Sequence, residues 1–351
     1  MKKIHFFTPL AFLLIFSVSL DLHAQKKKKN NVISIGFYNL ENLFDTINDI
    51  GLENSEEFTP QGTNKWTAER YQEKLKNMAY AISQIAVDET PDGVALLGLS
   101  EMENRRVLED LIKQKTIGDR NYQIVHFESS DARGIDVALI YQPKYFKVTE
   151  SKVYPLRMAE DTSWRTRDQL VVSGLLDGEK MNVIVNHWPS RSGGAIESEP
   201  KRIAAGDLCR HIVDSLLHMD KNAKILVLGD LNDNPDNPSI VEHLRAKGDR
   251  SRLEEGDLFN PMYDMYKTGI GSLEYKKIWD LFDQIVISQG LLGKGKSNYK
   301  FDKAYVFNKE FLKQKEGDYE GYPFRTFAGR NYMNGYSDHF PVYVNLVKEV
   351  K

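Results

Sequence analysis

Short apolar segments that end abruptly in polar residues recur along the chain and predict buried β-strands. The run 225–228 is apolar at every position, which is typical of a strand covered on both faces. It is followed closely by Asp230 and Asn232. Apolar or β-branched runs of the same kind occupy residues 32–38, 94–100, 282–288 and 340–346. The pattern therefore predicts a sheet-based core with polar groups at the strand ends.

Helices and further strands complete the expected architecture. Thr67 is expected to cap a helix that ends near Val87, because apolar residues recur there at helical spacing. Residues 45–65 are predicted to form a long surface loop. We expect an α/β domain of packed sheets whose outer faces are covered by helices. The other predicted helices are 105–113 and 200–219, and the other predicted strands are 122–127, 135–141, 169–176 and 181–185.

The composition is that of an ordinary globular protein, with 41% hydrophobic and 28% charged residues in a chain of 351. No break in composition indicates a second domain, so residues 32–351 are predicted to form a single domain. The only cysteine, Cys209, excludes an intramolecular disulfide and a zinc site built from several cysteines. Stability is therefore expected to come from the apolar core.

The first residues have the layout of a secretory signal peptide. Two lysines precede the apolar run 6–20, and Ala24 is a small residue suited to cleavage. We predict a signal peptide over 1–24, a basic flexible tail over 25–31, and a mature protein in the periplasm or outside the cell. A signal anchor is the alternative, but the apolar run is short for a membrane span. No later segment is apolar enough to span a membrane, and a monomer is expected.

The charge of the mature chain bears on its partners. Removal of residues 1–24 changes the formal net charge from −3 to −4, so no overall positive field attracts nucleic acid. A polyanionic substrate would need a local basic patch or a bound metal ion.

The strand end at Asp230 is the first candidate site. Asp230 and Asn232 share one side of the sheet if strand geometry continues, and Gly229 would allow the chain to turn. A calcium-binding loop is the sharpest alternative, but Pro235 stands where that loop needs glycine and Val241 where it needs glutamate. A plain strand-to-turn boundary is the other interpretation, because Asp and Asn are common in turns.

Polar residues from several separate regions share this position next to a predicted strand. Sites are commonly assembled from such strand-end loops. Carboxylates and amides without cysteine suit Mg²⁺, with Mn²⁺ or Ca²⁺ as alternatives, whereas zinc would call for several histidines or thiolates. A hard cation held by one or two carboxylates is the usual arrangement for phosphoryl chemistry. The residues are Asn39, Glu101, His187, Asp230, Asn232, Asp283, Asp338 and His339.

Six short motifs contain these residues. They are Phe37-Tyr38-Asn39-Leu40-Glu41-Asn42, Leu99-Ser100-Glu101, Val185-Asn186-His187, Gly229-Asp230-Leu231-Asn232, Phe282-Asp283-Gln284-Ile285 and Ser337-Asp338-His339-Phe340-Pro341. Each motif alone is weak evidence of a protein family, but all six in this order are strong evidence. On these motifs the chain resembles the endonuclease/exonuclease/phosphatase family, the metal-dependent phosphodiesterases related to pancreatic deoxyribonuclease. The resemblance spans essentially the whole mature chain.

The resemblance implies a fold and a metal site. The implied fold is a four-layer αββα sandwich of two packed mixed, mainly antiparallel sheets flanked by helices, with the site between the upper edges of the sheets. The implied principal metal ligand is Glu101, with Asn39 and Asp338 completing or orienting its shell.

The resemblance also implies catalytic roles. Asp230 would align and deprotonate the attacking water, helped by Asn232. His339, kept protonated by Asp283, would neutralise charge that grows on the phosphoryl oxygens, because a nearby carboxylate raises the pKa of an imidazole. His187 would donate a proton or a hydrogen bond to the phosphate or the leaving oxygen. In-line attack on phosphorus needs a positioned water, a cation to offset developing charge, and help for the departing oxygen.

Substrate contacts are predicted from residue type. Arg133, Arg167 and Arg191 are candidates for phosphate binding, because a guanidinium can donate two parallel hydrogen bonds to phosphate. Trp188 is a candidate for stacking on a base, and equally for a packed aromatic beside a flexible turn. Several nucleases of the family carry a tyrosine where this chain has His187, so abasic-site repair activity is not implied.

Three functions remain open from the sequence. The first is an exported nuclease that hydrolyses DNA or RNA phosphodiester bonds with Mg²⁺. The second applies the same chemistry to the head group of a phospholipid, to sphingomyelin or to an inositol phosphate. The third is a catalytically inactive relative that binds a partner, and the filled reactive positions count against it.

Overall fold

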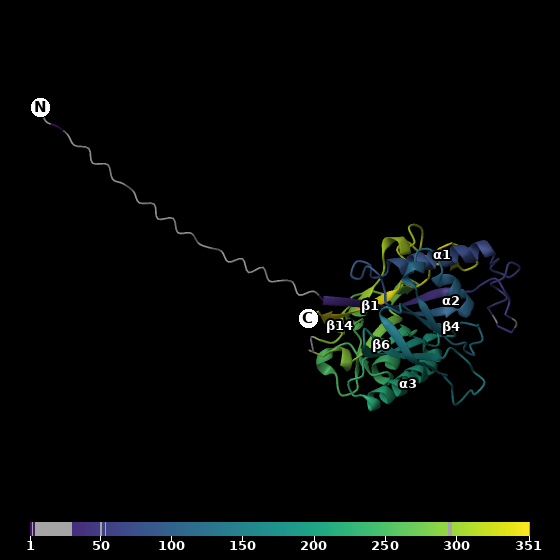
Figure 1. Ribbon diagram of the computed structural model, residues 1–351. Coiled ribbons are helices and arrows are strands. Elements are labelled where there is room, and N and C mark those ends of the chain that lie inside the picture. Colours follow the sequence, from purple (N-terminus) through teal and green to yellow (C-terminus); the bar gives the residue numbers. More distant parts are fainter. Residues whose placement is uncertain (2, 4–29, 50, 53, 294–296, 351) are drawn as a thin grey trace.

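Two β-sheets pack face to face in the computed structural model, which describes residues 1, 3, 30–49, 51–52, 54–293 and 297–350 (Figure 1). The predicted signal peptide over 1–24 and most of the predicted tail over 25–31 lie outside the described residues. Among the described residues, no helix combines the length and the apolar character that a membrane crossing requires.

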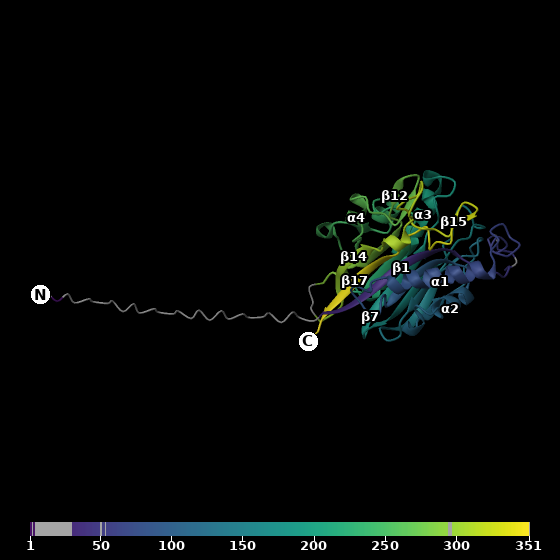
Figure 2. The same cartoon turned by 90° about the horizontal axis from the view of Figure 1, so that it is seen from above.

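The first sheet contains the two ends of the described domain. Its strand β1 pairs in parallel with β2 and antiparallel with β17, and Figure 2 shows β1 and β17 side by side. In spatial order the six strands are β14 (Lys300–Val306), β17 (Val342–Glu349), β1 (Asn30–Leu43), β2 (Leu96–Met102), β4 (Asp136–Tyr141) and β3 (Gln123–His126).

The second sheet has seven strands and is also mixed. Only the β7–β8 and β9–β10 pairs are parallel among its pairings. In spatial order the strands are β5 (Phe146–Tyr154), β6 (Gln169–Leu176), β7 (Glu179–His187), β8 (Ile225–Asp230), β13 (Asp283–Ser288), β10 (Leu258–Phe259) and β9 (Ala246–Lys247). Both sheets are therefore mixed and mainly antiparallel, as predicted.

Helices cover the outer faces of the two sheets (Figure 1). Helices α1 and α2 cover the first sheet and α3 covers the second. The helices are α1 (Ala68–Gln84), α2 (Arg105–Ile112), α3 (Ala195–Met219) and α4 (Tyr263–Lys267). Two small hairpins are formed by β11 (Leu273–Tyr275) with β12 (Ile278–Asp280) and by β15 (Phe327–Ala328) with β16 (Asn331–Tyr332). Single turns of 3-10 or π helix are η1 (Gly118–Arg120), η2 (Ser239–His243), η3 (Arg250–Arg252), η4 (Gln289–Leu291) and η5 (Glu310–Leu312).

Three apolar clusters lie between these four layers. One joins α1 and α2 to the first sheet, one lies between the sheets, and one joins α3 to the second sheet. Gly98 permits the close approach of the sheets, because a Cβ there would lie 2.1 Å from Cδ1 of Leu228. The architecture is the predicted four-layer αββα sandwich. The apolar cluster between its two sheets lies directly below the candidate site.

Several local predictions agree with the structure. Thr67 caps α1, accepting a hydrogen bond from the backbone N–H of Arg70. The predicted surface loop 45–65 has no helix or strand among its described residues, but Phe58 within it is only 6% exposed and packs on Phe44 and Trp66. This segment is therefore partly integrated into the core.

Other local predictions need correction. Helix α3 begins at Ala195, so Pro200 lies inside it rather than at its start. Gly229 belongs to β8 and makes no turn; a Cβ there would lie 2.3 Å from the backbone oxygen of Asn186, so glycine is needed for close strand packing. Strands β5 and β14 were not predicted, because they are edge strands with many exposed polar residues and weak apolar patterns.

Candidate active site

Strand alternation directs predicted site residues into the space between the sheets. In β8 the positions that face the other sheet are Leu226 and Leu228, and Asp230 follows them with the same two-residue period. Asp230 is paired with a residue of β7 on one side and a residue of β13 on the other. The same alternation brings to this face Asn39 of β1, His187 of β7 and Asp283 of β13.

The carboxylate of Asp230 is held at both oxygens. Oδ2 accepts a hydrogen bond from Nδ2 of Asn39 at 3.1 Å, which links the two sheets. Oδ1 accepts one from the backbone N–H of Asn232 at 3.0 Å. The Asn232 side chain donates to the carbonyl of Trp188 at 2.9 Å, so its amide nitrogen holds the loop while its backbone orients Asp230.

Glu101 reaches the site through a backbone irregularity rather than through regular alternation. It has a φ of 61°, and the pairing of β2 with β4 shifts register between Ser100 and Met102. Such a bulge re-aims a side chain at the end of a strand. Its Oε2 accepts a hydrogen bond from the backbone N–H of Asn42 at 3.1 Å, and its Oε1 lies 3.8 Å from Nε2 of His187.

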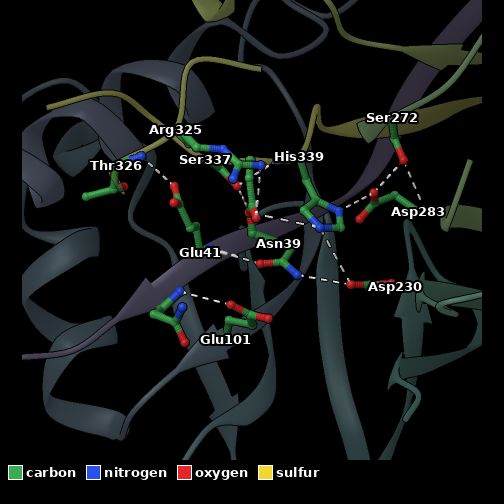
Figure 3. Close-up of polar contacts among 12 residues, drawn as sticks. Asn39, Glu41, Glu101, Asp230, Ser272, Asp283, Arg325, Thr326, Ser337 and His339 are labelled. Atoms are coloured by element: carbon green, nitrogen blue, oxygen red, sulfur yellow. Dashed lines mark hydrogen bonds and ion pairs between the residues drawn. The ribbon is translucent and has the colours of Figure 1, made fainter. Parts of the chain in front are cut away.

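His339 and Asp283 form the tightest ion pair at the site (Figure 3). Nδ1 of His339 lies 2.6 Å from Oδ2 of Asp283, and the hydroxyl of Ser272 donates to the same oxygen at 2.5 Å. Nε2 of His339 faces Oδ2 of Asp230 at 3.9 Å and Oδ1 of Asp338 at 4.0 Å. Figure 3 shows Asn39, Glu101, Asp230 and His339 directed toward a common centre.

Burial and neighbouring charges shift the pKa values of these groups in different directions. Burial raises the pKa of Asp230 to about 7, with the carboxylates of Asp283 and Glu101 adding to the shift and His339 opposing it. Burial alone would lower the pKa of His339, but Asp283, Asp230 and Asp338 outweigh it and raise that pKa well above the usual value. The raised pKa favours the charged form of His339.

His187 has the opposite character. Burial, followed by the charges of Arg167, Arg133 and His339, lowers the pKa of His187 well below the usual value. Its Nε2 lies 3.7 Å from Oδ2 of Asp230, and its Nδ1 has no hydrogen-bond partner within the described part of the chain. The imidazole is therefore neutral and suits hydrogen bonding more than proton donation.

The donor set fits a hard divalent cation. The site offers carboxylate and amide oxygens and no thiolate, which are the ligand types that Mg²⁺ and similar ions prefer. The charge of Glu101 contributes to the raised pKa of Asp230, so a cation held by Glu101 would offset that charge. Asp230, Asp283 and His339 also lie within 4.8 Å of one another, but Asp283 and His339 are already engaged with each other.

Two of the four predicted substrate contacts are buried. Trp188 is 1% exposed and donates through Nε1 to Asn186, so it is a packed aromatic that has no face free for a base. Arg167 is 7% exposed and donates to Asp131 and to the carbonyl of Trp188. These side chains support the loop that follows β7.

Arg191 and Arg133 both make contacts within the protein, and each keeps part of its side chain exposed, 27% and 34% respectively. Arg191 donates to the carboxylate of Asp233 at 3.0 Å and stacks on the ring of Phe282. Arg133 donates to the side chain of Asn42 at 2.7 Å, lies 3.8 Å from Glu101 and keeps 34% of its side chain exposed. Arg133 and Arg191 are therefore the two predicted contacts with partly exposed side chains next to site residues, since Nε of Arg191 donates to the carbonyl of Asn232 at 3.0 Å.

A second set of residues at the site was missed from the sequence. Lys74 of α1 is 1% exposed and donates to Oγ1 of Thr326 and to the carbonyl of Tyr336, both at 2.6 Å. Its Nζ lies 3.9 Å from Oε2 of Glu41, which also accepts from the backbone N–H of Thr326. Arg325 lies 3.7 Å from Oδ2 of Asp338. This network ties the segment before Asp338 to α1 and β1.

Only one of these residues had a signal in the sequence. Glu41 lies in the first motif, two residues after Asn39, and was not included in the predicted site. Lys74, Ser272 and Arg325 stand in segments with no distinctive pattern, and only the fold brings them near the other residues.

Comparisons with solved structures agree with this fold. TDP2 from C. elegans matches with a TM-score of 0.55 at 15% identity, covering 90% of this chain and 75% of that chain. The mannosyl-6-phosphatase of Bacteroides thetaiotaomicron matches with a TM-score of 0.54 at 14% identity, covering 90% of this chain and 99% of that chain. TDP2 from D. rerio, complexed with a single-strand DNA product, matches with a TM-score of 0.50 at 13% identity, covering 90% and 98%. At these identities the matches show the fold.

Sequence comparison identifies the family. No curated protein matches the chain by sequence. The sequence profile described as the endonuclease/exonuclease/phosphatase family matches residues 34–348, which is nearly all of the region that forms the two sheets. The chain therefore belongs to the endonuclease/exonuclease/phosphatase family and is a metal-dependent hydrolase of phosphoric ester bonds.

Proposed function

We propose that the chain hydrolyses small phosphate esters at the site between the two sheets, with Asp230 as the residue that orients and deprotonates water. The observation that carries this proposal is the fixation of both Asp230 oxygens by Asn39 and Asn232, at 3.1 Å and 3.0 Å. A general base must be held within hydrogen-bond reach of the proton that it accepts. His339, charged through Asp283, stabilises the negative phosphoryl oxygens from the other side of Asp230.

We assign the cation to Glu101, Asn39 and Asp338, with Mg²⁺ as the expected ion. A bound divalent cation supplies charge neutralisation at the phosphate. Oδ1 of Asn39 accepts a hydrogen bond from the backbone N–H of Glu41 at 2.9 Å, and its second lone pair would be the one that faces the ion, while Nδ2 holds Asp230. Neutral His187 donates a hydrogen bond to the phosphate or to the leaving oxygen. Of the two roles predicted from the sequence, proton donation and hydrogen bonding, the proposal keeps only hydrogen bonding.

The substrate class follows from the surroundings of the site. Extended nucleic acids are bound mainly through phosphates that lysines and arginines neutralise. Arg167 and Arg191 are committed to internal carboxylates, and Trp188 is buried, which leaves few groups for a long polyanion. The fold relationship to a mannosyl-6-phosphatase supports a small phosphorylated substrate.

A nucleic acid is the second candidate. The exposed side chains of Arg133 and Arg325 lie beside Glu101 and Asp338, respectively, so two guanidinium groups border the proposed metal ligands. Phosphates that flank a scissile bond would find these two cations. The DNA-bound TDP2 structure supports a nucleic acid substrate on the same fold. The head group of a phospholipid, sphingomyelin or an inositol phosphate shares the small-ester chemistry of the first candidate.

Export is also part of the proposal. The apolar run 6–20 that follows two lysines supports a periplasmic or extracellular location. Fractionation of cells that express the full chain, followed by mass determination of the exported form, tests it. A full-length protein that stays with the cytoplasmic fraction contradicts it.

A substrate panel tests the proposed activity. Purified protein is incubated with sugar phosphates, inositol phosphates, a sphingomyelin analogue, plasmid DNA and RNA, first with Mg²⁺ and then with EDTA. We expect metal-dependent release of phosphate or of a phosphorylated head group, and its loss in Asp230→Asn. Plasmid or RNA cleavage without turnover of small esters would favour the second candidate. Silence on every substrate would reject the proposal.

A further inference from the structure

A pocket of about 590 Å³ lies between the β11–β12 hairpin and the β15–β16 hairpin. The segment between Gln314 and Arg325 supplies part of its wall. The pocket volume suits one small organic group. The residues that matter for the inference are Glu274, Tyr275, Tyr319, Tyr322, Arg325 and Asn331.

Both sides of this pocket are connected to the candidate active site. Arg325 lines the pocket, and its guanidinium lies 3.7 Å from Oδ2 of Asp338. Ser272 immediately precedes β11, and its hydroxyl donates to Asp283 while its carbonyl accepts from the backbone N–H of Phe340. Figure 3 shows Arg325 and Ser272 on either side of His339. A substrate whose phosphate is held at the site can therefore extend its other part into the pocket.

The pocket offers aromatic faces to its contents. Tyr275 and Tyr319 are 64% and 62% exposed, so much of each side chain is open to solvent. The ring of Tyr319 meets that of Tyr322 edge to face, with 5.6 Å between the centroids. Exposed aromatic faces at the mouth of a pocket favour a ligand with a flat or weakly polar ring face.

Hydrogen-bonding groups stand beside these rings. The carboxylate of Glu274 is 9% exposed and hydrogen-bonds to the hydroxyl of Tyr322, which raises the pKa of Tyr322 to about 12. The amides of Gln314 and Asn331 also line the pocket. Carboxylate and amide groups next to a tyrosine face suit a ring that carries several hydroxyl groups, because each hydroxyl both donates and accepts.

The β11–β12 turn holds its residues in an unfavourable conformation. Lys276 and Lys277 have φ values of 50° and 67°, and Tyr275 pairs with Ile278 across them. Two-residue hairpin turns with positive φ normally use Asn-Gly or similar residues. Strain of this kind persists where surrounding structure or function requires it. Here it presents Tyr275 at the pocket.

We propose that this pocket binds the polyhydroxylated ring, a sugar or a cyclitol, of the phosphate ester that the site hydrolyses. The inference rests on the proposed function, because the phosphate is expected at Asp338 and His339. Tyr319 and Tyr275 pack on the ring, Glu274 and Asn331 bind its hydroxyl groups, and Arg325 stands between the ring and the phosphate.

Calorimetric titration with free monosaccharides and inositol tests the pocket without catalysis. We expect at least one of these rings to bind the EDTA-treated protein, and Tyr319→Ala to weaken that binding about tenfold. The matched control is Ile278→Ala, since Ile278 is 64% exposed on the same hairpin but is absent from the pocket lining. The control should bind as the unaltered protein does. Unfolding curves of both variants confirm that they fold.

Kinetics provide the second measurement. The ratio of kcat/KM for the matching ring phosphate to that for a simple alkyl phosphate should fall about tenfold in Tyr319→Ala, mainly through KM. Ring binding without hydrolysis of any phosphate ester would retain the pocket and reject the proposed function. Hydrolysis with an unchanged ratio would reject the pocket. Binding of nucleosides but not of sugars would also overturn the inference. So would a loss of activity on a phospholipid substrate in vesicles that is as large in Ile278→Ala as in Tyr319→Ala.

Discussion

Lys74 permits the sharpest test of how the site is supported. Its side chain is fully buried, and Nζ makes two 2.6 Å hydrogen bonds, to Thr326 and to the carbonyl of Tyr336, besides the 3.9 Å ion pair with Glu41. In Lys74→Met the side-chain length is nearly kept, but Glu41, whose pKa burial raises to about 7, loses the ammonium group 3.9 Å away that opposes this shift. Breaking a buried pair on one side costs about 3–5 kcal/mol. We expect the free energy of unfolding to fall by that amount.

The assay is urea unfolding monitored by tryptophan fluorescence. The slope of the unfolding free energy against urea concentration is compared between variants. The matched control is Lys76→Met on the same helix, whose side chain is 69% exposed and pairs with Glu73 at 3.7 Å. Exposed pairs contribute about 0–1 kcal/mol, so this control should change little. The double variant Lys74→Met with Glu41→Gln should recover much of the loss, because no uncompensated charge remains.

Two results would refute the reasoning about Lys74. One is a loss in Lys74→Met no larger than that in Lys76→Met. The other is a double variant whose losses simply add, since residues that share an ion pair are expected to show an interaction energy. Activity provides a further check: because Lys74 anchors the segment that leads to Asp338, turnover should fall in the single variant and return in part in the double variant.

Three further predictions concern the site and its surroundings. Asp230→Asn should reduce kcat by a factor of about 10³, as expected for the loss of a proton acceptor in general base catalysis. Urea unfolding confirms that the variant folds, and near-normal turnover would disprove the role of Asp230. EDTA should abolish hydrolysis and added Mg²⁺ should restore it, and activity that persists after exhaustive chelation would exclude the assigned cation. Burial raises the pKa of Cys209 to about 12, so its thiol stays protonated at pH 8 and should resist a thiol reagent there until urea unfolds the chain. Rapid labelling of the native protein would contradict this.

Much of the architecture could be predicted from local patterns. Continuous apolar runs identified β8 and β2, because strands buried on both faces need apolar residues on both. Helical spacing and the cap at Thr67 identified α1. Edge strands β5 and β14 escaped detection, since one face of such a strand is exposed and carries polar residues that resemble a loop.

The candidate site was predictable where strand alternation continues. Asn39 and Asp230 follow their strands with the two-residue period that faces the other sheet, so motif and geometry agree. Glu101 was identified as a polar residue at a strand end, and its role as a metal ligand came from the resemblance, but alternation does not explain its direction, because its left-handed backbone and the register shift of β2 redirect the side chain. Trp188 and Arg167 were chosen by residue type, and their burial shows why type alone is a weak guide.

The sequence by itself determined most of the central strands, the main helices and the polar residues at strand ends, because these depend on the periodicity and chemistry of near neighbours. The tertiary structure decided which charges are paired, which arginines are free, and where Lys74, Ser272 and Arg325 join the site. Those outcomes depend on contacts between residues far apart in the chain, such as Lys74 with Thr326 and Asn39 with Asp230. Such contacts form only when both sheets and their covering segments have packed, and no local pattern encodes them.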